Sequence, residues 1–306
     1  FLSTQGAHTE ALGEDLNLVN LLQSQWGHLF TNTEEFTGRP SISPDGRSIV
    51  FATQENRQHI LGHLTLLGVK RPIMPWCSDG PSEAELGGTL DTTLSRWADA
   101  CHGQGGTVII PHFPNPNGEP AVLITTGRVD GLEMIRHDMY CHQEYYRYLN
   151  CGYRIPIVGG TDKMSSEVPV GLYRTYVHIP DDQPFTYETW CENLKKGNTF
   201  HSGGPILRFT VDGQPIGSTL NLPGNGGTVE VEATAESVLP IHSVGIETYG
   251  YKPLSEVDVH YTVGVANGRG LLFGDTIDAQ DLNNHTAVYG VLSFAPAAVS
   301  GLRLGL

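Results

Sequence analysis

Several features are scarce in this sequence of 306 residues, and each absence excludes a class of protein. The longest apolar runs, Thr107–Pro111 and Ile155–Val158, are far shorter than the roughly 20 residues of a membrane-spanning helix. No basic block is longer than the pairs Lys70–Arg71 and Lys195–Lys196, and the formal net charge is −15. Proteins that bind nucleic acid or acidic membrane surfaces need a basic face. We therefore expect neither kind of partner.

Cysteines and the common catalytic motifs are also sparse. The sequence has 5 cysteines and no CxxC pair, which predicts free or buried thiols and not a disulfide framework. It lacks GxGxxG after the first expected strand, GxxxxGK[ST], HExxH and GxSxG. Nucleotide-binding loops and the usual serine hydrolase sites are therefore without support. No convincing basic partner accompanies Cys77, Cys101 or Cys191, so a cysteine nucleophile is not expected either.

The first two thirds of the chain alternate helix and strand patterns, which is typical of an α/β domain with parallel strands. Glycine and proline are abundant, at 37 and 19 residues, so many turns are expected. After about residue 205 only short strand patterns separated by glycine-containing turns remain. We predict an α/β domain over residues 1–205 and a smaller all-β domain over 206–306. The expected strands are Leu16–Leu22, Ile49–Ala52, Leu64–Val69, Thr107–Ile110 and Ile155–Val158, and the expected helices are Gly6–Leu12, one capped by Asp91, His137–Leu149 and one from Thr186 to Gly197.

Residue types that bind metals follow several of the expected strands. Glu55 comes after the strand ending near Ala52, and His112 directly follows TVII. Glu133 and Asp162 follow two later strands. Function collects at the carboxyl ends of parallel strands. Oxygen and imidazole ligands without thiolates suit zinc, manganese or iron in a hydrolytic site.

His63 allows two interpretations. Glu55, His59 and His63 are spaced i, i+4, i+8, which on a helix would place all three on one face. Gly62 and the branched residues after it instead favour a turn that enters a strand. We favour this second interpretation, with His63 as a metal ligand at the start of the next strand.

Five blocks in order carry a family resemblance: QENR…GHLTLLG, GGTVIIPHFP, LNCGYRIPIVGGTD, PVGLYRTYV, and WCENLKKGNTF with SGGP and LRFTVDG. They resemble metallohydrolases of the carbaryl-hydrolase type (CehA/McbA-like), within the polymerase and histidinol phosphatase (PHP) superfamily, over about residues 7–217. The resemblance implies a distorted (β/α)7 barrel that binds one to three divalent metal ions, Zn, Mn or Fe. It also implies metal-activated water acting on a phosphoester, carbamate or carboxyl ester. The implied metal ligands are Glu55, His63, His112 and Asp162.

The remaining candidate residues surround these ligands. Arg57 or Arg174 is expected to stabilise a developing anion, although Arg174 could instead pair with a carboxylate. Glu133 and His201 are expected to contact a small ester-like substrate. The loop from Phe200 to Pro205 could alternatively be a hinge between the two domains.

Two departures from the family pattern bear on activity. The superfamily begins with a His-x-His pair that this chain lacks, and we expect it upstream of Phe1. Asp162-Lys163-Met164 also lacks the histidine of a closing Asp-x-His. The alternative function is therefore a non-catalytic PHP-like protein that binds a metal or a small anionic or sugar ligand. The sequence leaves the compartment and the oligomeric state open.

Overall fold

A computed structural model of the chain describes the residues 2–26, 29–58, 60–78, 92–113, 119–136, 139–140, 142–221, 227–237, 243–245, 259–260, 276–278, 285–294 and 302–303. Within these ranges, no helix combines the length and the apolar character that crossing a lipid bilayer requires.

An eight-stranded mixed sheet forms the centre of the first part of the chain. Its hydrogen-bonded order is β10-β7-β6-β5-β4-β1-β2, with β3 paired to β4. The pairs β1–β4, β6–β7 and β7–β10 are parallel, and the others are antiparallel. The strands are β1 (Leu18–Trp26), β2 (Leu29–Thr31), β3 (Ser41–Ile42), β4 (Ile49–Gln58), β5 (Gly62–Leu67), β6 (Thr107–Ile110), β7 (Gly131–Glu133) and β10 (Ile157–Val158).

The expected closed barrel of parallel strands is wrong for the described residues, because the hydrogen-bonded path is open and ends at β2 and β10. Only residues 59–61 connect β4 to β5. A parallel crossover needs a dozen or more residues, and a connection as short as this one allows only an antiparallel hairpin. The expected α/β class is confirmed in the coarser form of a mixed sheet covered by helices.

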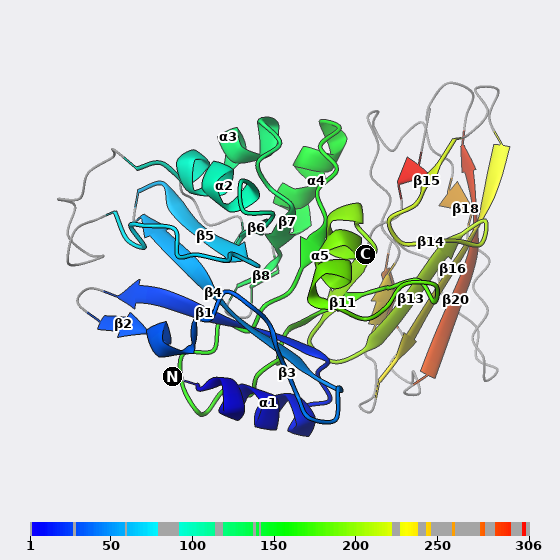
Figure 1. The fold of residues 1–306 in the computed structure, drawn as a ribbon. Coiled ribbons are helices and arrows are strands. Elements are labelled where there is room, and N and C mark those ends of the chain that lie inside the picture. Colours follow the sequence, from blue (N-terminus) through cyan, green and yellow to red (C-terminus); the bar gives the residue numbers. More distant parts are fainter. Residues whose placement is uncertain are drawn as a thin grey trace.

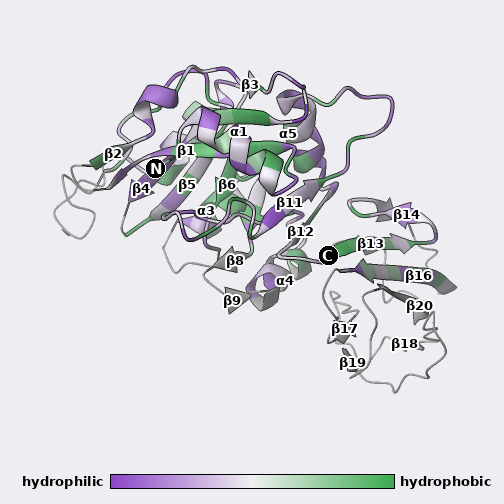
Figure 2. Cartoon of the chain, turned by 90° about the horizontal axis from the view of Figure 1, so that it is seen from below, coloured by the Kyte–Doolittle hydropathy of each residue, from purple (hydrophilic) through white to green (hydrophobic). Residues whose placement is uncertain are grey.

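One face of this sheet, called here the outer face, carries the larger hydrophobic core. Helix α1 packs against Val19, Leu21 and Val50 through Ala7 and Ala11. Leu64, Leu66, Val108, Ile110, Leu132 and Ile157 lie under the remaining helices of this face. In Figure 1 the helices over β5, β6 and β7 are visible above the sheet and α1 lies below it, and in Figure 2 the central strands are largely green, the apolar colour. The outer helices are α1 (Thr4–Gly13), α2 (Leu94–His102), α3 (Pro120–Thr125) and α4 (His142–Asn150).

The opposite face, called here the inner face, is covered by helix α5 (Tyr187–Lys196). Because side chains alternate along a strand, the register places one set of residues from every strand on this face. Leu194 packs with Leu67, Ile109 and Val158. The other residues whose side chains lie on the inner face are Leu18, Ile49, Phe51, Thr53, Glu55, Arg57, His63, Thr65 and Glu133.

The expected boundaries of α5 are confirmed. Thr186 and Thr189 form a capping box at its start. Gly197 ends it in the left-handed conformation, with φ of 83°. The strands β11 (Arg174–Val177) and β12 (Thr199–Ser202) flank the helix in sequence and pair antiparallel.

Two expected helix starts are wrong. Thr93, and not Asp91, caps α2, because its hydroxyl accepts the Arg96 N–H; Asp91 itself lies outside the described residues. The helix expected from His137 begins at His142, because β8 (Ile135–Arg136) and β9 (Met139–Tyr140) pair in a small hairpin before it. Four of the cysteines are described, and all are free thiols as expected: Cys77, Cys101, Cys151 and Cys191.

The described residues after 205 contain strands only, as predicted. A five-stranded antiparallel sheet has the order β14-β13-β16-β20-β18 and lies beside the α/β part (Figure 1). That residues 206–306 form a separate domain stays a prediction. The strands are β13 (Ile206–Val211), β14 (Gln214–Pro215), β15 (Thr219–Leu220), β16 (Gly227–Glu236), β17 (Ser243–Gly245), β18 (Val259–His260), β19 (Thr276–Asp278), β20 (His285–Phe294) and β21 (Leu302–Arg303).

The packing of α5 on the inner face gives a test of the fold. Leu194 is only 1% exposed between the strands and the helix. Leu194→Ala should lower the free energy of unfolding by about 2–5 kcal/mol, because it removes buried apolar volume and leaves a cavity. Urea denaturation measures this value. Lys196→Ala, at an exposed position of the same helix, is the control and should change stability by less than about 0.5 kcal/mol.

Candidate metal centre

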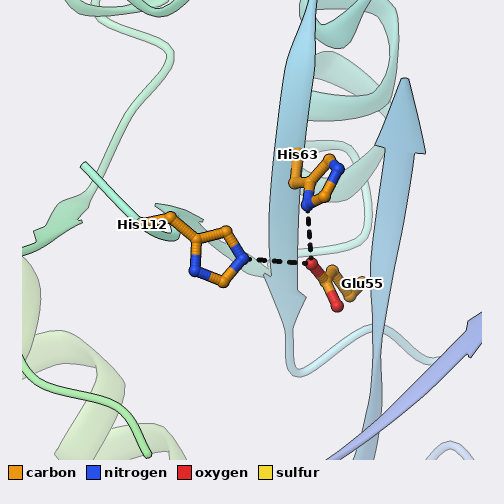
Figure 3. Close-up of side chains that lie close together, drawn as sticks. All are labelled: Glu55, His63 and His112. Carbon is orange, nitrogen blue, oxygen red and sulfur yellow. Dashed lines mark ion pairs between the residues drawn. The ribbon is translucent and has the colours of Figure 1, made fainter. Parts of the chain in front are cut away.

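Three ligand-type side chains converge at one end of the inner face. One ligand atom from each of Glu55, His63 and His112 lies within 4.8 Å of the other two. The Glu55 Oε1 atom is 3.2 Å from His63 Nδ1 and 3.7 Å from His112 Nε2 (Figure 3). We call these three residues the Glu-His-His cluster. Three of the four residues that the resemblance implies as metal ligands are thus brought together.

The register of the β4–β5 hairpin places Glu55 and His63 side by side. Arg57 pairs with His63 and Glu55 pairs with Thr65, so these four residues lie on one face. Glu55 and His63 are diagonal neighbours across the two strands. The expectation that Glu55 follows a strand ending near Ala52 is wrong, because β4 continues to Gln58. The helical interpretation of Glu55 and His63 is also wrong; His59 lies outside the described residues.

Gln58 fixes the turn of this hairpin. Its side-chain Oε1 accepts the backbone N–H groups of Ile60 and Leu61, each at 2.6 Å. The Gln58 residue is only 1% exposed, so these bonds form away from bulk water. The turn therefore holds the start of β5, and with it His63, in register with Glu55.

His112 enters the cluster from the turn after β6. Its φ of 55° is left-handed, a conformation that histidine tolerates better than most side chains. The backbone N–H of His112 donates to Glu133 Oε2 at 2.8 Å. The His112 ring meets the His63 ring edge to face, with centroids 5.6 Å apart. Glu133 thus stabilises the turn that directs His112 toward Glu55.

The charges within the cluster favour an ionised carboxylate. Burial acts to raise the pKa of Glu55, but the neighbouring His112 and His63 side chains and the charge of Arg57 hold that pKa well below its usual value. Burial acts to lower the pKa of His112, but the carboxylates of Glu55, Glu133 and Asp162 raise it overall. Glu55 is therefore a buried carboxylate that lies beside one guanidinium and two imidazole rings.

Glu133 occupies a tight space between two turns. Burial raises its pKa to about 7; the charge of His112 opposes this rise, and Asp162 and Glu55 add to it. A Cβ atom on Gly160 would collide with Glu133 Oε1, so the close approach requires glycine at position 160. Gly160, after β10, is therefore a contact surface for the Glu133 carboxylate.

The other predicted site residues lie at different distances from the cluster. Asp162 has a left-handed φ of 49° and lines the same cavity as Glu55, but it is outside the group within 4.8 Å. Arg57 is buried, and its Nη2 donates to Glu55 Oε2 at 3.1 Å. Arg57 is therefore in direct contact with the Glu-His-His cluster through Glu55.

Arg174 makes mainly structural contacts, and His201 lies outside the cavity lining. Arg174 donates to the carbonyls of Gly171 and Glu14, at 2.7 and 3.0 Å, and its Nη2 lies 3.9 Å from a Glu14 carboxylate oxygen. The guanidinium still forms part of the cavity wall. His201 is buried in β12 and is not among the described residues that line the cavity. Its role in substrate binding stays a prediction.

A cavity of about 560 Å³ opens beside the cluster and is lined by Glu55, His112, Glu133 and Asp162. Sequence analysis missed Lys163, which also lines it and is held by Glu10 and the Ser165 carbonyl. Its position next to Asp162, after the glycine turn, was the available signal. The apolar residues of α5 in the wall were also missed, since no pattern relates that helix to the strand ends.

The donor set of the cluster fits a divalent transition metal. One carboxylate and two imidazoles form a common set of protein ligands for catalytic zinc, which leaves a further position open. Atoms that bind one ion at about 2.0–2.2 Å in a tetrahedron lie roughly 3.4 Å apart. The separations of 3.2 and 3.7 Å from Glu55 Oε1 are close to this value. The side chains can therefore hold an ion with small adjustments.

No known family profile matches the chain, and no curated protein matches it in sequence. Among solved structures, one match is a two-domain protein from Bacteroides vulgatus described as containing a predicted PHP-like metal-dependent phosphoesterase. It shares 11% identity, with 97% of this chain and 88% of that chain covered and a TM-score of 0.45. A likeness of this degree assigns no function, so the proposal below depends on the residues of the site.

Glu133 offers a test of how the cluster is positioned. Glu133→Ala should weaken Zn²⁺ binding by about 10-fold to 100-fold, because the His112 N–H loses its acceptor and the turn loosens. Glu133→Gln keeps an acceptor oxygen and should retain most of the affinity. Isothermal titration with Zn²⁺ measures both variants. Equal loss in the two variants would show that the charge of Glu133, and not its hydrogen bond, matters.

His201 gives a test of pH-dependent stability. Burial lowers its pKa from 6.5 to about 4, so the folded protein binds this proton more weakly than the unfolded chain. The free energy of unfolding is therefore highest, with respect to this group, above pH 6.5. It falls by up to about 3 kcal/mol as the pH drops from 6.5 toward 4. His201→Asn should reduce this loss. Urea denaturation at several pH values measures it, and identical pH profiles would contradict the assignment.

Proposed function

We propose that this chain is a metal-dependent hydrolase that acts on an ester-like bond of a small molecule. The observation that carries the proposal is the convergence of the buried Glu-His-His cluster beside a cavity of about 560 Å³. Cavities of this size accommodate small-molecule ligands. The ion would be Zn, Mn or Fe, held by Glu55, His63 and His112, with Asp162 as a further ligand from the cavity wall.

When bound, such an ion polarises an ester-type oxygen and makes water a stronger nucleophile near neutral pH. In ester hydrolysis the water oxygen bonds to the carbonyl carbon or phosphorus, and the bond to the leaving oxygen breaks. One proton of the water passes to the leaving group. The surrounding side chains must therefore stabilise the negative charge that develops on the reacting oxygen and allow this proton transfer.

The chain's own residues would orient the ligands and balance the developing charge. Glu55 remains ionised because of the two histidines and the guanidinium beside it. Arg57 places a buried guanidinium beside this carboxylate, where it can stabilise negative charge on the reacting oxygen. We favour Arg57 over Arg174 for this role, because the Arg174 guanidinium already donates to two backbone carbonyls.

Metal content and turnover test the proposal together. We expect at least one equivalent of Zn, Mn or Fe after purification without chelator. The protein should hydrolyse at least one member of a panel of phosphoesters, carbamates and carboxyl esters, and chelation should abolish the activity. His112→Ala should remove both metal and turnover while circular dichroism shows an intact fold. His178→Ala, at an exposed position, is the matched histidine control.

Other results would contradict this function in distinct ways. Metal binding without turnover on any ester class would favour the alternative, a metal-binding or ligand-binding protein without catalysis. Turnover that survives His112→Ala would exclude the cluster as the catalytic centre. Failure to bind any of the three metals, even when they are supplied, would exclude a metal-dependent mechanism for this chain.

A further inference from the structure

The cavity beside the Glu-His-His cluster has an apolar side that the proposed reaction does not use. The half-buried side chains of Leu18, Leu22 and Trp190 line it. Its base is closed by Leu67, Ile109, Val158 and Leu194, which are 4%, 5%, 5% and 1% exposed. We call Leu18, Leu22 and Trp190 the apolar wall.

The apolar wall and the cluster belong to one continuous face. Thr65 lies opposite Glu55 in the hairpin, and Ile109 lies opposite Thr65 on the next strand. Leu67 follows Thr65 on the same face, roughly 7 Å along the strand. A molecule whose reacting bond lies at Glu55 therefore has apolar surface within the length of a short side chain.

The cations that line the cavity are already paired with carboxylates of the protein. Arg57 lies 3.1 Å from Glu55, Lys163 lies 3.6 Å from Glu10, and Arg174 lies 3.9 Å from Glu14. Glu133 and Asp162 place two further carboxyl groups on the lining of the cavity. A second anionic group, away from the reacting oxygen that Arg57 would stabilise, would therefore meet carboxyl groups and the paired cations Lys163 and Arg174, and its desolvation would be poorly compensated.

We propose that the substrate of this site is a neutral carboxylic ester whose acyl group is apolar and lies against Leu18, Leu22 and Trp190. This inference rests on the proposed hydrolase function and narrows its substrate class. Water adds its oxygen to the acyl carbon, the bond to the alcohol oxygen breaks, and the alcohol leaves with one proton. The products are a carboxylic acid and a neutral alcohol.

A chain-length series of 4-nitrophenyl esters measures the contribution of the apolar wall. With the metal-loaded protein, kcat/KM should rise at least tenfold from the acetate through the butyrate to the octanoate, after subtraction of the rate in chelator. 4-Nitrophenyl phosphate should be a poorer substrate than the octanoate. A flat or falling series, or preference for the phosphate, would overturn the substrate class and leave the hydrolase function standing.

Two substitutions at Leu22 change the wall in opposite directions. Leu22→Trp fills the cavity and should remove the advantage of the octanoate over the acetate. Leu22→Ala enlarges the cavity and should move the preference toward longer chains, so it tests the wall even where the tryptophan variant misfolds. Leu12→Trp, on a side chain 61% exposed in α1, is the control and should leave the series unchanged.

A binding measurement separates the two proposals from each other. Octanamide is a neutral analogue that resists hydrolysis, and it should shift the tryptophan fluorescence of the metal-free protein, whereas acetamide should not. Trp190→Phe should remove the shift. Binding of octanamide without turnover of any ester would overturn the hydrolase function but support the apolar wall. The absence of octanamide binding would overturn the wall itself.

Discussion

The diagonal contact between Glu55 and His63 across the β4–β5 hairpin is the constraint on which the candidate site depends. With only residues 59–61 between the strands, the register allows little adjustment. A slip by one residue would move Glu55 to the outer face, into the core under α2 and α3. Gln58 opposes such a slip, because its buried amide oxygen binds both backbone N–H groups of the turn. The local chemistry of one glutamine thus sets the geometry of two ligands.

The same alternation divides the sheet into a structural face and a functional one. The outer face is apolar along β5, β6 and β7 and is sealed by helices. The inner face changes along its strands, from apolar residues under α5 to polar residues at the ends of β4 and β7. Gly131 contributes to this division, because a Cβ there would lie only 2.8 Å from the Ile109 side chain. A single helix therefore covers the apolar half of the inner face, and the polar half remains available to a ligand.

Local patterns predicted much of this arrangement, and the failures have physical causes. The apolar positions Leu94, Trp97, Ala98 and Cys101 are all buried as their helical spacing requires, and Thr186 and Gly197 bound α5 as predicted. The sequence pattern ends this strand near Ala52 because polar residues follow, yet six successive polar residues, 53–58, lie buried in β4. The side-chain amides of Gln54 and Asn56 both donate to the Ile73 carbonyl. No strand pattern in the sequence predicts that the segment around Ile73 lies beside β4. Tertiary hydrogen bonds extended the strand beyond its apolar part.

The acidity of the chain is consistent with a site built to receive a cation. Four carboxylates, from Glu10, Glu55, Glu133 and Asp162, line one cavity, and the cations beside them are paired one by one. Carboxylates gathered in a partly buried space repel one another, and two routes relieve that repulsion: protons or a metal ion. Burial and the acidic neighbours raise the pKa of Glu133, which favours its protonation. The two histidines and Arg57 instead lower the pKa of Glu55 and keep it ionised. Within one cavity, the environment thus separates a carboxyl group that accepts protons from a carboxylate suited to bind metal.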